Sequence, residues 1–242
     1  MPAKLDLQEK GAVRNGERLV SGERLFMQFL AFGNCPGAGS AAEALAAAAF
    51  ESVLYEDVND PGGIGLLTWS KDPAFFVTGV RELVLRPPFS YFDAKPEYTM
   101  LGRTYALGHE PDLEAWLVQR PRETALNPDW PWAVWYPLRR AGAFSGLASE
   151  ERVSVLSEHG KIGHAFGEAD YAHDIRLACF GLDKNDNDFV IGLTGRELYP
   201  LSACVEAMRK TQQTARFIQS MGPFFVGRAA WQSPLSASET GR

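Results

Sequence analysis

A histidine at the end of a predicted helix has the clearest potential for chemistry in this 242-residue chain. The helix expected over 149–159 carries Val155 and Leu156 four and three residues before His159, so the imidazole emerges on or beside the apolar stripe. Gly160 follows directly and is expected to end the helix. A histidine that points from a helix end into an apolar cavity is a good axial ligand for haem iron. The alternative is a core histidine with an ordinary hydrogen-bond partner.

A pair of opposite charges lies on a predicted hairpin of strands 175–180 and 189–194. Asp174 and Arg176 are two positions apart, so their side chains share one face, and Cys179 points the other way. If this face lines a cavity, Arg176 can stabilise an anion or a peroxide-derived oxygen on a metal, with Asp174 as its partner. The alternative is a solvated ion pair on an exposed strand.

An aromatic strand predicted over 132–138 ends in two arginines. Alternation places Trp132, Val134 and Tyr136 on one face. A phenol among apolar neighbours can donate a hydrogen bond or, near an oxidising iron, become a radical. Arg139 or Arg140 can bind a carboxylate through two parallel hydrogen bonds. The alternative is a buried aromatic strand with basic residues at its exposed end.

Gln212 interrupts the apolar face of a long helix predicted over 201–221. A buried amide needs a hydrogen-bond partner, because leaving it unpaired costs roughly 1–3 kcal/mol. The second ring nitrogen of His159 is one candidate partner, since metal-bound histidines commonly use that nitrogen in a hydrogen bond. The other candidate is water at the edge of the face.

The elements that position these residues repeat one pattern. The first copy comprises strands 24–32, 53–59, 64–69 and 98–106 with helices 40–50 and 72–85. The second comprises strands 132–138, 175–180, 189–194 and 224–231 with helices 149–159 and 201–221. The pattern predicts an α+β fold in which two tandem ferredoxin-like β-α-β-β-α-β units form a pseudo-dimeric α+β barrel. The expected organisation is an arm (1–22), a first unit (23–106), a connector (107–130), a second, haem-binding unit (131–231) and a tail (232–242).

Composition narrows the classes of function. A net charge of −6 without a basic tract argues against nucleic-acid binding. The alanine-rich stretch 41–50 is too short to span a membrane, and residues 1–6 lack the apolar region of a signal peptide. The cysteines are three, far apart and in no metal-binding spacing: Cys35, Cys179 and Cys204. They predict reduced thiols in a cytoplasmic protein.

Several short motifs occur in order within this doubled pattern. They are Tyr-Pro-Leu-Arg-Arg at 136–140, His-Gly-Lys-Ile-Gly at 159–163, Phe-Gly-Leu-Asp at 180–183, Met-Arg at 208–209 and Met-Gly-Pro-Phe-Phe-Val-Gly at 221–227. With this order and spacing, residues 23–231 resemble the chlorite dismutase family, which includes the coprohaem decarboxylases.

The resemblance implies an iron porphyrin, haem b or coprohaem, with His159 as the proximal ligand and His164 as a rival. Tyr136 stands where the decarboxylases carry a tyrosine that becomes a radical when peroxide oxidises the iron. Chlorite-degrading members depend on a distal arginine in the hairpin strand, and alternative alignments place Arg176 or Asp174 there. The family commonly forms rings, so a homo-oligomer, commonly a pentamer, is expected.

Three positions depart from the family pattern. Gln212 stands where a glutamate usually contacts the proximal histidine, Phe144-Ser145 replaces an aromatic pair, and Arg140 replaces a lysine. The leading hypothesis is peroxide-dependent decarboxylation of coprohaem, with Tyr136 as the radical residue, Arg140 holding a propionate and Arg176 as a distal or propionate-side cation. The alternatives are conversion of chlorite to chloride and dioxygen, or a haem carrier, a haem sensor or a relative without a cofactor.

Overall fold

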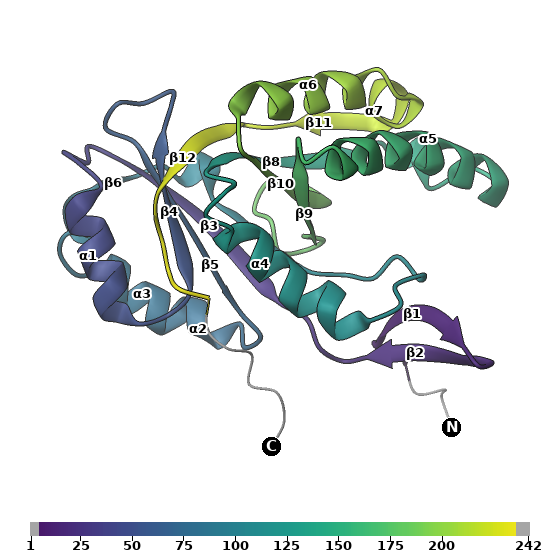
Figure 1. Ribbon diagram of the computed structural model, residues 1–242, viewed down its shortest axis with the longest axis horizontal. Coiled ribbons are helices and arrows are strands. Elements are labelled where there is room, and N and C mark those ends of the chain that lie inside the picture. Colours follow the sequence, from purple (N-terminus) through teal and green to yellow (C-terminus); the bar gives the residue numbers. More distant parts are fainter. Residues whose placement is uncertain (1–4, 236–242) are drawn as a thin grey trace.

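The structure is a computed structural model that describes residues 5–235. Its centre is a ten-stranded antiparallel sheet that closes on itself, because β10 pairs with both β9 and β8 (Figure 1). The first half of the chain contributes β3 (Phe26–Gly33), β4 (Ser52–Asp57), β5 (Ile64–Ser70) and β7 (Met100–Arg103). The second half contributes β8 (Trp132–Arg140), β9 (His173–Ala178), β10 (Phe189–Gly195) and β12 (Phe225–Gln232).

The order of strands is the same in the two halves. It reads β7-β3-β5-β4 in the first and β12-β8-β10-β9 in the second, so that the last, first, third and second strands of each half follow one another. This is the arrangement of a ferredoxin-like unit. The halves join where the second strand of each pairs with the last strand of the other, as β4 with β12 and β7 with β9. The predicted pseudo-dimeric α+β barrel is confirmed.

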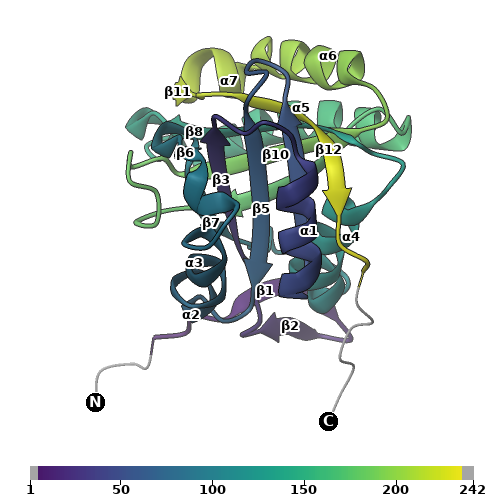
Figure 2. The ribbon, with the colours of Figure 1, turned by 90° about the vertical axis from the view of Figure 1, so that its left-hand side faces the viewer.

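Helices cover the outer faces of the two half-sheets. In the first half, α1 (Gly39–Ala48) lies over β4 and β5 and buries Ala41 and Leu45 against them (Figure 2). It is followed by α2 (Ala74–Val77) and α3 (Gly79–Val84). In the second half, α5 (Ser149–Glu168), α6 (Leu198–Arg209) and α7 (Gln212–Phe217) lie together on the other side of the barrel. Strands covered on both faces read as nearly continuous apolar runs, as in β3 and β8.

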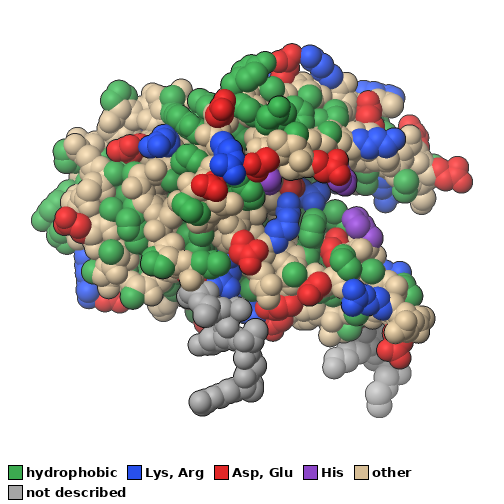
Figure 3. All heavy atoms as spheres, in the orientation of Figure 1, with side chains coloured by type: hydrophobic (Ala, Val, Ile, Leu, Met, Phe, Trp, Pro, Cys, Tyr) green, Lys and Arg blue, Asp and Glu red, His purple; other side chains and the backbone are tan. Residues whose placement is uncertain are grey.

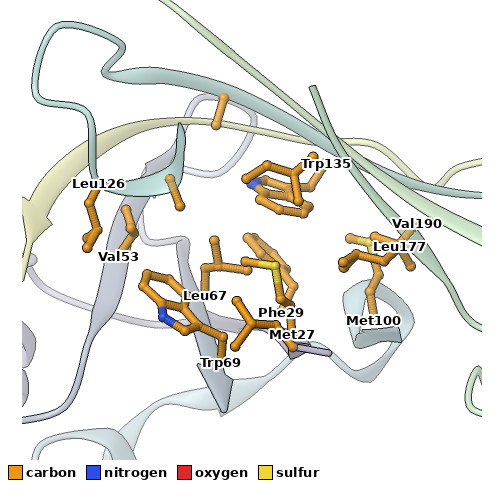
Figure 4. Packing of buried hydrophobic residues seen from close by; sticks show 14 of the residues in the cluster. Met27, Phe29, Val53, Leu67, Trp69, Met100, Leu126, Trp135, Leu177 and Val190 are labelled. Carbon is orange, nitrogen blue, oxygen red and sulfur yellow. The ribbon is translucent and has the colours of Figure 1, made fainter. Parts of the chain in front are cut away.

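The interior of the barrel is filled by large side chains. Trp135 reaches in from β8 and stacks on Phe29 of β3, with ring centroids 5.8 Å apart (Figure 4). Gly192 on the neighbouring strand makes room for the indole, since a Cβ there would lie 2.5 Å from the ring. Because these large side chains occupy the interior, a site for a large ligand is expected on an outer face of the sheet.

Two predicted helix boundaries are wrong. The helix with His159 does not end at Gly160 but continues to Glu168, because Gly160 does not adopt the left-handed conformation that ends a helix. The helix predicted over 201–221 breaks after Arg209, restarts as the short α7 and becomes the strand β11 (Ile218–Met221). The break turns the later residues to new directions, which changes the environment of Gln212.

The predicted arm and the predicted connector both contain regular structure. Residues 9–21 form a hairpin of β1 (Glu9–Arg14) and β2 (Glu17–Ser21) around Asn15-Gly16, and both turn residues have positive φ. The connector contains a π-helical segment (Ala115–Gln119) that continues into α4 (Arg120–Leu126). Shorter elements are β6 (Asp93–Ala94) and the 3-10 turns Phe89–Tyr91, Pro96–Tyr98 and Gly142–Phe144.

At the C-terminal end, the predicted tail is described only as far as Leu235. Within residues 5–235, no helix combines the length and the apolar character needed to cross a bilayer.

Candidate functional site

The candidate site begins with the outer face of the second half-sheet. The register places Tyr136 of β8, Ile191 of β10 and Arg176 of β9 in one row, so their side chains point to the same side. Asp174 lies two residues from Arg176 and shares this face, as the alternation predicts. Cys179 has the opposite parity and is buried in the barrel core. Tyr136 and the charged pair therefore meet on one surface.

Tyr136 lies in the apolar layer between the sheet and the helices. Its ring stacks on Phe224 with centroids 4.5 Å apart, and Leu201 and Cys204 of α6 belong to the same cluster. Burial raises the pKa of the phenol far above its ordinary value, and the nearby Cys204 and Asp174 raise it further. The side chain is therefore a neutral phenol held away from water.

His159 lies in the middle of α5, where its imidazole is half-buried. Its Nδ1 lies 3.3 Å from the hydroxyl of Thr211. Burial lowers the pKa of His159 to about 4, with further lowering by the positive charges of Arg140 and Arg176. The ring is therefore neutral at pH 7, and a neutral imidazole is the form that binds metals. Among the described residues, its Nε2 has no hydrogen-bond partner.

Of the two candidate partners of the Gln212 side chain, the His159 imidazole is wrong, and the exposed position agrees with the alternative, water at the edge of the face. Gln212 is exposed, and its backbone N–H donates to the Glu158 carboxylate at 3.0 Å, while its neighbours Thr211 and Gln213 are buried. The long-helix register that would have turned Gln212 inward is interrupted before Thr211. Any role of Gln212 in cofactor binding stays a prediction.

The rival histidine, His164, lies on the outer side of α5. It is inside the helix and not beyond its end, because α5 continues to Glu168. Its imidazole is 71% exposed and lies 3.4 Å from Glu168. His164 is therefore not brought to the face that carries Tyr136 and Arg176.

Asp174 is held between two guanidinium groups. Arg120 contacts one carboxylate oxygen at 2.7 Å, and Arg176 contacts the other at 2.6 Å. Burial alone would raise the pKa of Asp174, but the charges of Arg176 and Arg120 outweigh it and hold the pKa below its ordinary value. Both guanidinium groups also lie near the ring of Trp116, at 4.8 Å for Arg120 and 5.5 Å for Arg176.

Arg140 is a cation without a carboxylate partner among the described residues. Its guanidinium carbon lies 4.5 Å from the ring centre of Phe144 and 4.6 Å from that of Phe189. Its Nε is buried and makes no hydrogen bond, and burial lowers its pKa. Arg139 is different, because it forms a 2.6 Å ion pair with the exposed Asp186. Of the two arginines at the end of β8, Arg140 is the one available to an anion.

Three site residues were not predicted, namely Tyr105, Trp116 and Arg120. Tyr105 follows β7 in the first half; burial raises the pKa of its phenol, and the charges of Arg176 and Arg140 oppose this rise. Trp116 and Arg120 come from the connector, where their spacing of four residues puts both on one side of a helical turn. Together with Arg176 they line a small cavity of about 10 Å³, which has room for one water molecule.

The molecular surface is hollowed next to this cluster. Figure 3 shows a recess between the part of the molecule formed by α5 and the part formed by α4 with the β1–β2 hairpin, and Lys, Arg and His side chains gather in it. Among residues 5–235, no three histidine, cysteine, aspartate or glutamate side chains gather to hold a metal ion.

The chain is similar in sequence and in fold to proteins of one known family. Residues 112–230 match the sequence profile of the chlorite dismutase family, and this range includes α4, β8 to β11, most of β12 and the segment with Thr211. A comparison with curated protein sequences found no match.

Solved structures extend the likeness to most of the chain. A haem-binding protein from Thermus thermophilus is similar, with 17% identity and a TM-score of 0.67 over 92% of each chain. Chlorite dismutase from Candidatus Nitrospira defluvii, in complex with imidazole, is similar with 14% identity and a TM-score of 0.62, over 88% of this chain and 93% of that one. The resemblance is confirmed: this protein carries the chlorite dismutase family's sequence pattern over residues 112–230 and that family's fold over most of its length.

Proposed function

We propose that this protein binds an iron porphyrin on the face that carries His159 and Tyr136, and that it decarboxylates coprohaem with peroxide as the oxidant. The observation that carries the proposal concerns three groups: Tyr136 and Arg140 alternate onto one face of β8, and the charge of Arg140 acts on His159 of α5. They are a neutral imidazole with a free Nε2, a water-excluded phenol and an unpaired guanidinium: His159, Tyr136 and Arg140. Each corresponds to one need of the reaction, namely an iron ligand, an oxidisable residue and a carboxylate clamp.

The residues present fit a flat apolar group with acidic side chains. Of the 20 residues of α5, only Val155 is buried, and Leu156 next to the His159 turn is 38% exposed. Apolar side chains beside the imidazole are thus available to the face of a macrocycle. Arg140 and Arg176 offer guanidinium groups to carboxylates, and both act electrostatically on His159. Coprohaem carries more carboxylates than haem b, so it makes fuller use of these cations.

The chain's own residues have distinct tasks in this proposal. Bound iron porphyrin supplies the oxidising chemistry when peroxide is present. Tyr136 provides a phenol that can lose one electron and one proton, and its stacking on Phe224 keeps it in place and away from water. Arg140 holds a propionate, and Asp174 keeps Arg176, two residues along the same strand β9, in a fixed position. His159 holds the iron from α5.

The test is mass spectrometry of the porphyrin after the protein is mixed with iron coproporphyrin and stoichiometric peroxide. We expect stepwise loss of two carboxyl groups with the wild type and none with Tyr136→Phe. Tyr199→Phe is the matched control, because Tyr199 is 79% exposed on α6 and should leave the reaction unchanged. An intact porphyrin with the wild type would rule out the decarboxylase function.

Chlorite conversion is the second candidate, and the position of Arg176 favours it. Its guanidinium group is one third exposed beside the small cavity, where it can meet a small anion. Release of oxygen on adding chlorite, abolished in Arg176→Ala, would support this activity. Porphyrin binding without turnover of peroxide or chlorite would instead indicate a carrier or sensor.

A further inference from the structure

The break between α6 and α7 contains a buried hydroxyl group with several partners. Thr211 is 1% exposed and caps the start of α7, where its Oγ1 accepts a hydrogen bond from the Thr214 N–H at 3.4 Å. The same hydroxyl lies 2.7 Å from the carbonyl oxygen of Met208, near the end of α6. A carbonyl oxygen can only accept, so the single hydroxyl proton of Thr211 is donated to Met208.

This hydrogen bond from Thr211 to Met208 determines which ring nitrogen of His159 carries the proton. Nδ1 of His159 lies 3.3 Å from the Thr211 oxygen, whose own proton is already committed to Met208. The proton in the contact between the two side chains must therefore come from Nδ1. A neutral imidazole protonated at Nδ1 carries its lone pair on Nε2.

A second contact fixes the same two segments next to each other. The Glu158 carboxylate accepts a hydrogen bond from the backbone N–H of Gln212 at 3.0 Å. Glu158 and His159, consecutive in α5, thus contact Gln212 and Thr211, which are consecutive where α7 begins. This double attachment limits rotation of α5 about its axis and holds the imidazole opposite the threonine.

We propose that Thr211 is a positioning residue that keeps His159 in the Nδ1–H tautomer, so that Nε2 is free for the iron of the proposed porphyrin. Because its hydroxyl is a neutral acceptor, Thr211 polarises the imidazole less than a carboxylate in the same place does. The bound iron is therefore easier to reduce than it is when a carboxylate accepts the Nδ1 proton. The part of the inference that concerns iron rests on the proposed function, whereas the tautomer does not.

The first experiment uses the full chain without porphyrin. Long-range ¹H–¹⁵N NMR at pH 7.5 reports which nitrogen of each histidine carries the proton, and His159→Gln identifies the signals of His159. We expect the wild type to show protonated Nδ1 and unprotonated Nε2. Thr211→Val keeps the side-chain shape but removes the acceptor, and it should shift the ring mainly to the Nε2–H form, whereas Thr211→Ser should retain the wild-type pattern.

Because Thr211→Val also removes the cap of α7, Thr211→Asp provides a variant that keeps a capping oxygen and adds charge. It should keep the Nδ1–H form and, with haem b bound, lower the midpoint potential relative to the wild type and Thr211→Ser. An Nε2–H ring in the wild type, or an unchanged tautomer in folded Thr211→Val, would overturn the inference. Failure to bind porphyrin would instead refute the proposed function and leave the NMR result intact.

Discussion

Arg120 and Asp174 form a 2.7 Å ion pair that connects α4, between the two halves of the chain, to the site strand β9. The other oxygen of the carboxylate contacts Arg176. A residue from the connector thus takes part in the electrostatics of a site that otherwise consists mainly of second-half residues. The charges of Arg176 and Arg120 together explain why Asp174 stays ionised although burial opposes its charge.

Removing the guanidinium group of Arg120 should make Asp174 easier to protonate. In Arg120→Met only Arg176 remains to oppose the effect of burial, so we expect the pKa of Asp174 to rise. NMR titration of the side-chain carboxyl carbons measures the change directly. Arg86→Met is the control, because Arg86 pairs with Glu82 on the surface of α3 and should leave the Asp174 titration unchanged. A constant Asp174 pKa in Arg120→Met would show that the ion pair is absent in solution.

The buried imidazole should make the stability of the porphyrin-free protein depend on pH. Unfolded His159 takes up a proton near pH 6.5, whereas in the folded protein its pKa is about 4. The unfolded state therefore binds more protons between these values, and the free energy of unfolding falls as the pH drops from 6.5 to 4, by at most about 1.4 kcal/mol per pH unit. Urea unfolding at pH 7 and pH 5 should show this loss in the wild type and in His164→Gln, but not in His159→Gln.

An alanine at Gly160 should stabilise the protein. Gly160 lies inside α5, and a Cβ there meets nothing within 4 Å apart from its chain neighbours and the backbone of its own helix. Replacing a glycine in a helix by alanine stabilises by roughly 0.5–1 kcal/mol. Thermal unfolding should give a higher midpoint for Gly160→Ala and a lower one for Gly181→Ala, whose φ of +69° disfavours a side chain. A loss of stability in Gly160→Ala would mean that the helix ends at this glycine.

In contrast to Gly160→Ala, an alanine at Gly192 inside the barrel should destabilise the protein. A Cβ at Gly192 would lie 2.5 Å from the ring of Trp135, which is fully buried. Overpacking of this kind typically costs about 1–3 kcal/mol, so Gly192→Ala should lower the urea midpoint by a corresponding amount. Adding Trp135→Phe should recover part of the loss, because the smaller ring makes space. Equal and additive losses in the double variant would show that the two residues do not touch.

Local periodicity was enough to predict which strand residues share a face. Alternation put Asp174 and Arg176 on one face of β9, because the direction of a strand side chain depends only on its position in the strand. That Tyr136 of β8 shares this face follows from the register with β10, which alternation does not give. The repeated order of strands and helices was equally local, and it led to the barrel. Family motifs then pointed to His159 and Arg140 before any geometry was known.

Helix ends and long-range partners could not be predicted in the same way. Whether Gly160 ends a helix depends on its φ angle, which the packing of α5 on α6 and α7 helps to set. The break that turns Thr211 inward and Gln212 outward depends on contacts with Glu158 and His159. Tyr105 and Arg120 reach the site only through the tertiary fold, and a single sequence gives no signal for contacts of that kind.

Closure of the barrel depends on a strand that is synthesised late. Ser52 and Ser233 exchange hydrogen bonds of 3.0 Å across 181 residues of chain, where β4 meets β12. Because domains fold from the N-terminus during synthesis, β4 leaves the ribosome early and its outer edge has no partner until β12 follows. Unpaired strand edges invite association with other chains. During most of translation, the outer edge of β4 is therefore unpaired and open to pairing with other chains. Among the strands of residues 5–235, β12 is the last to be synthesised, and it is the one that covers this edge.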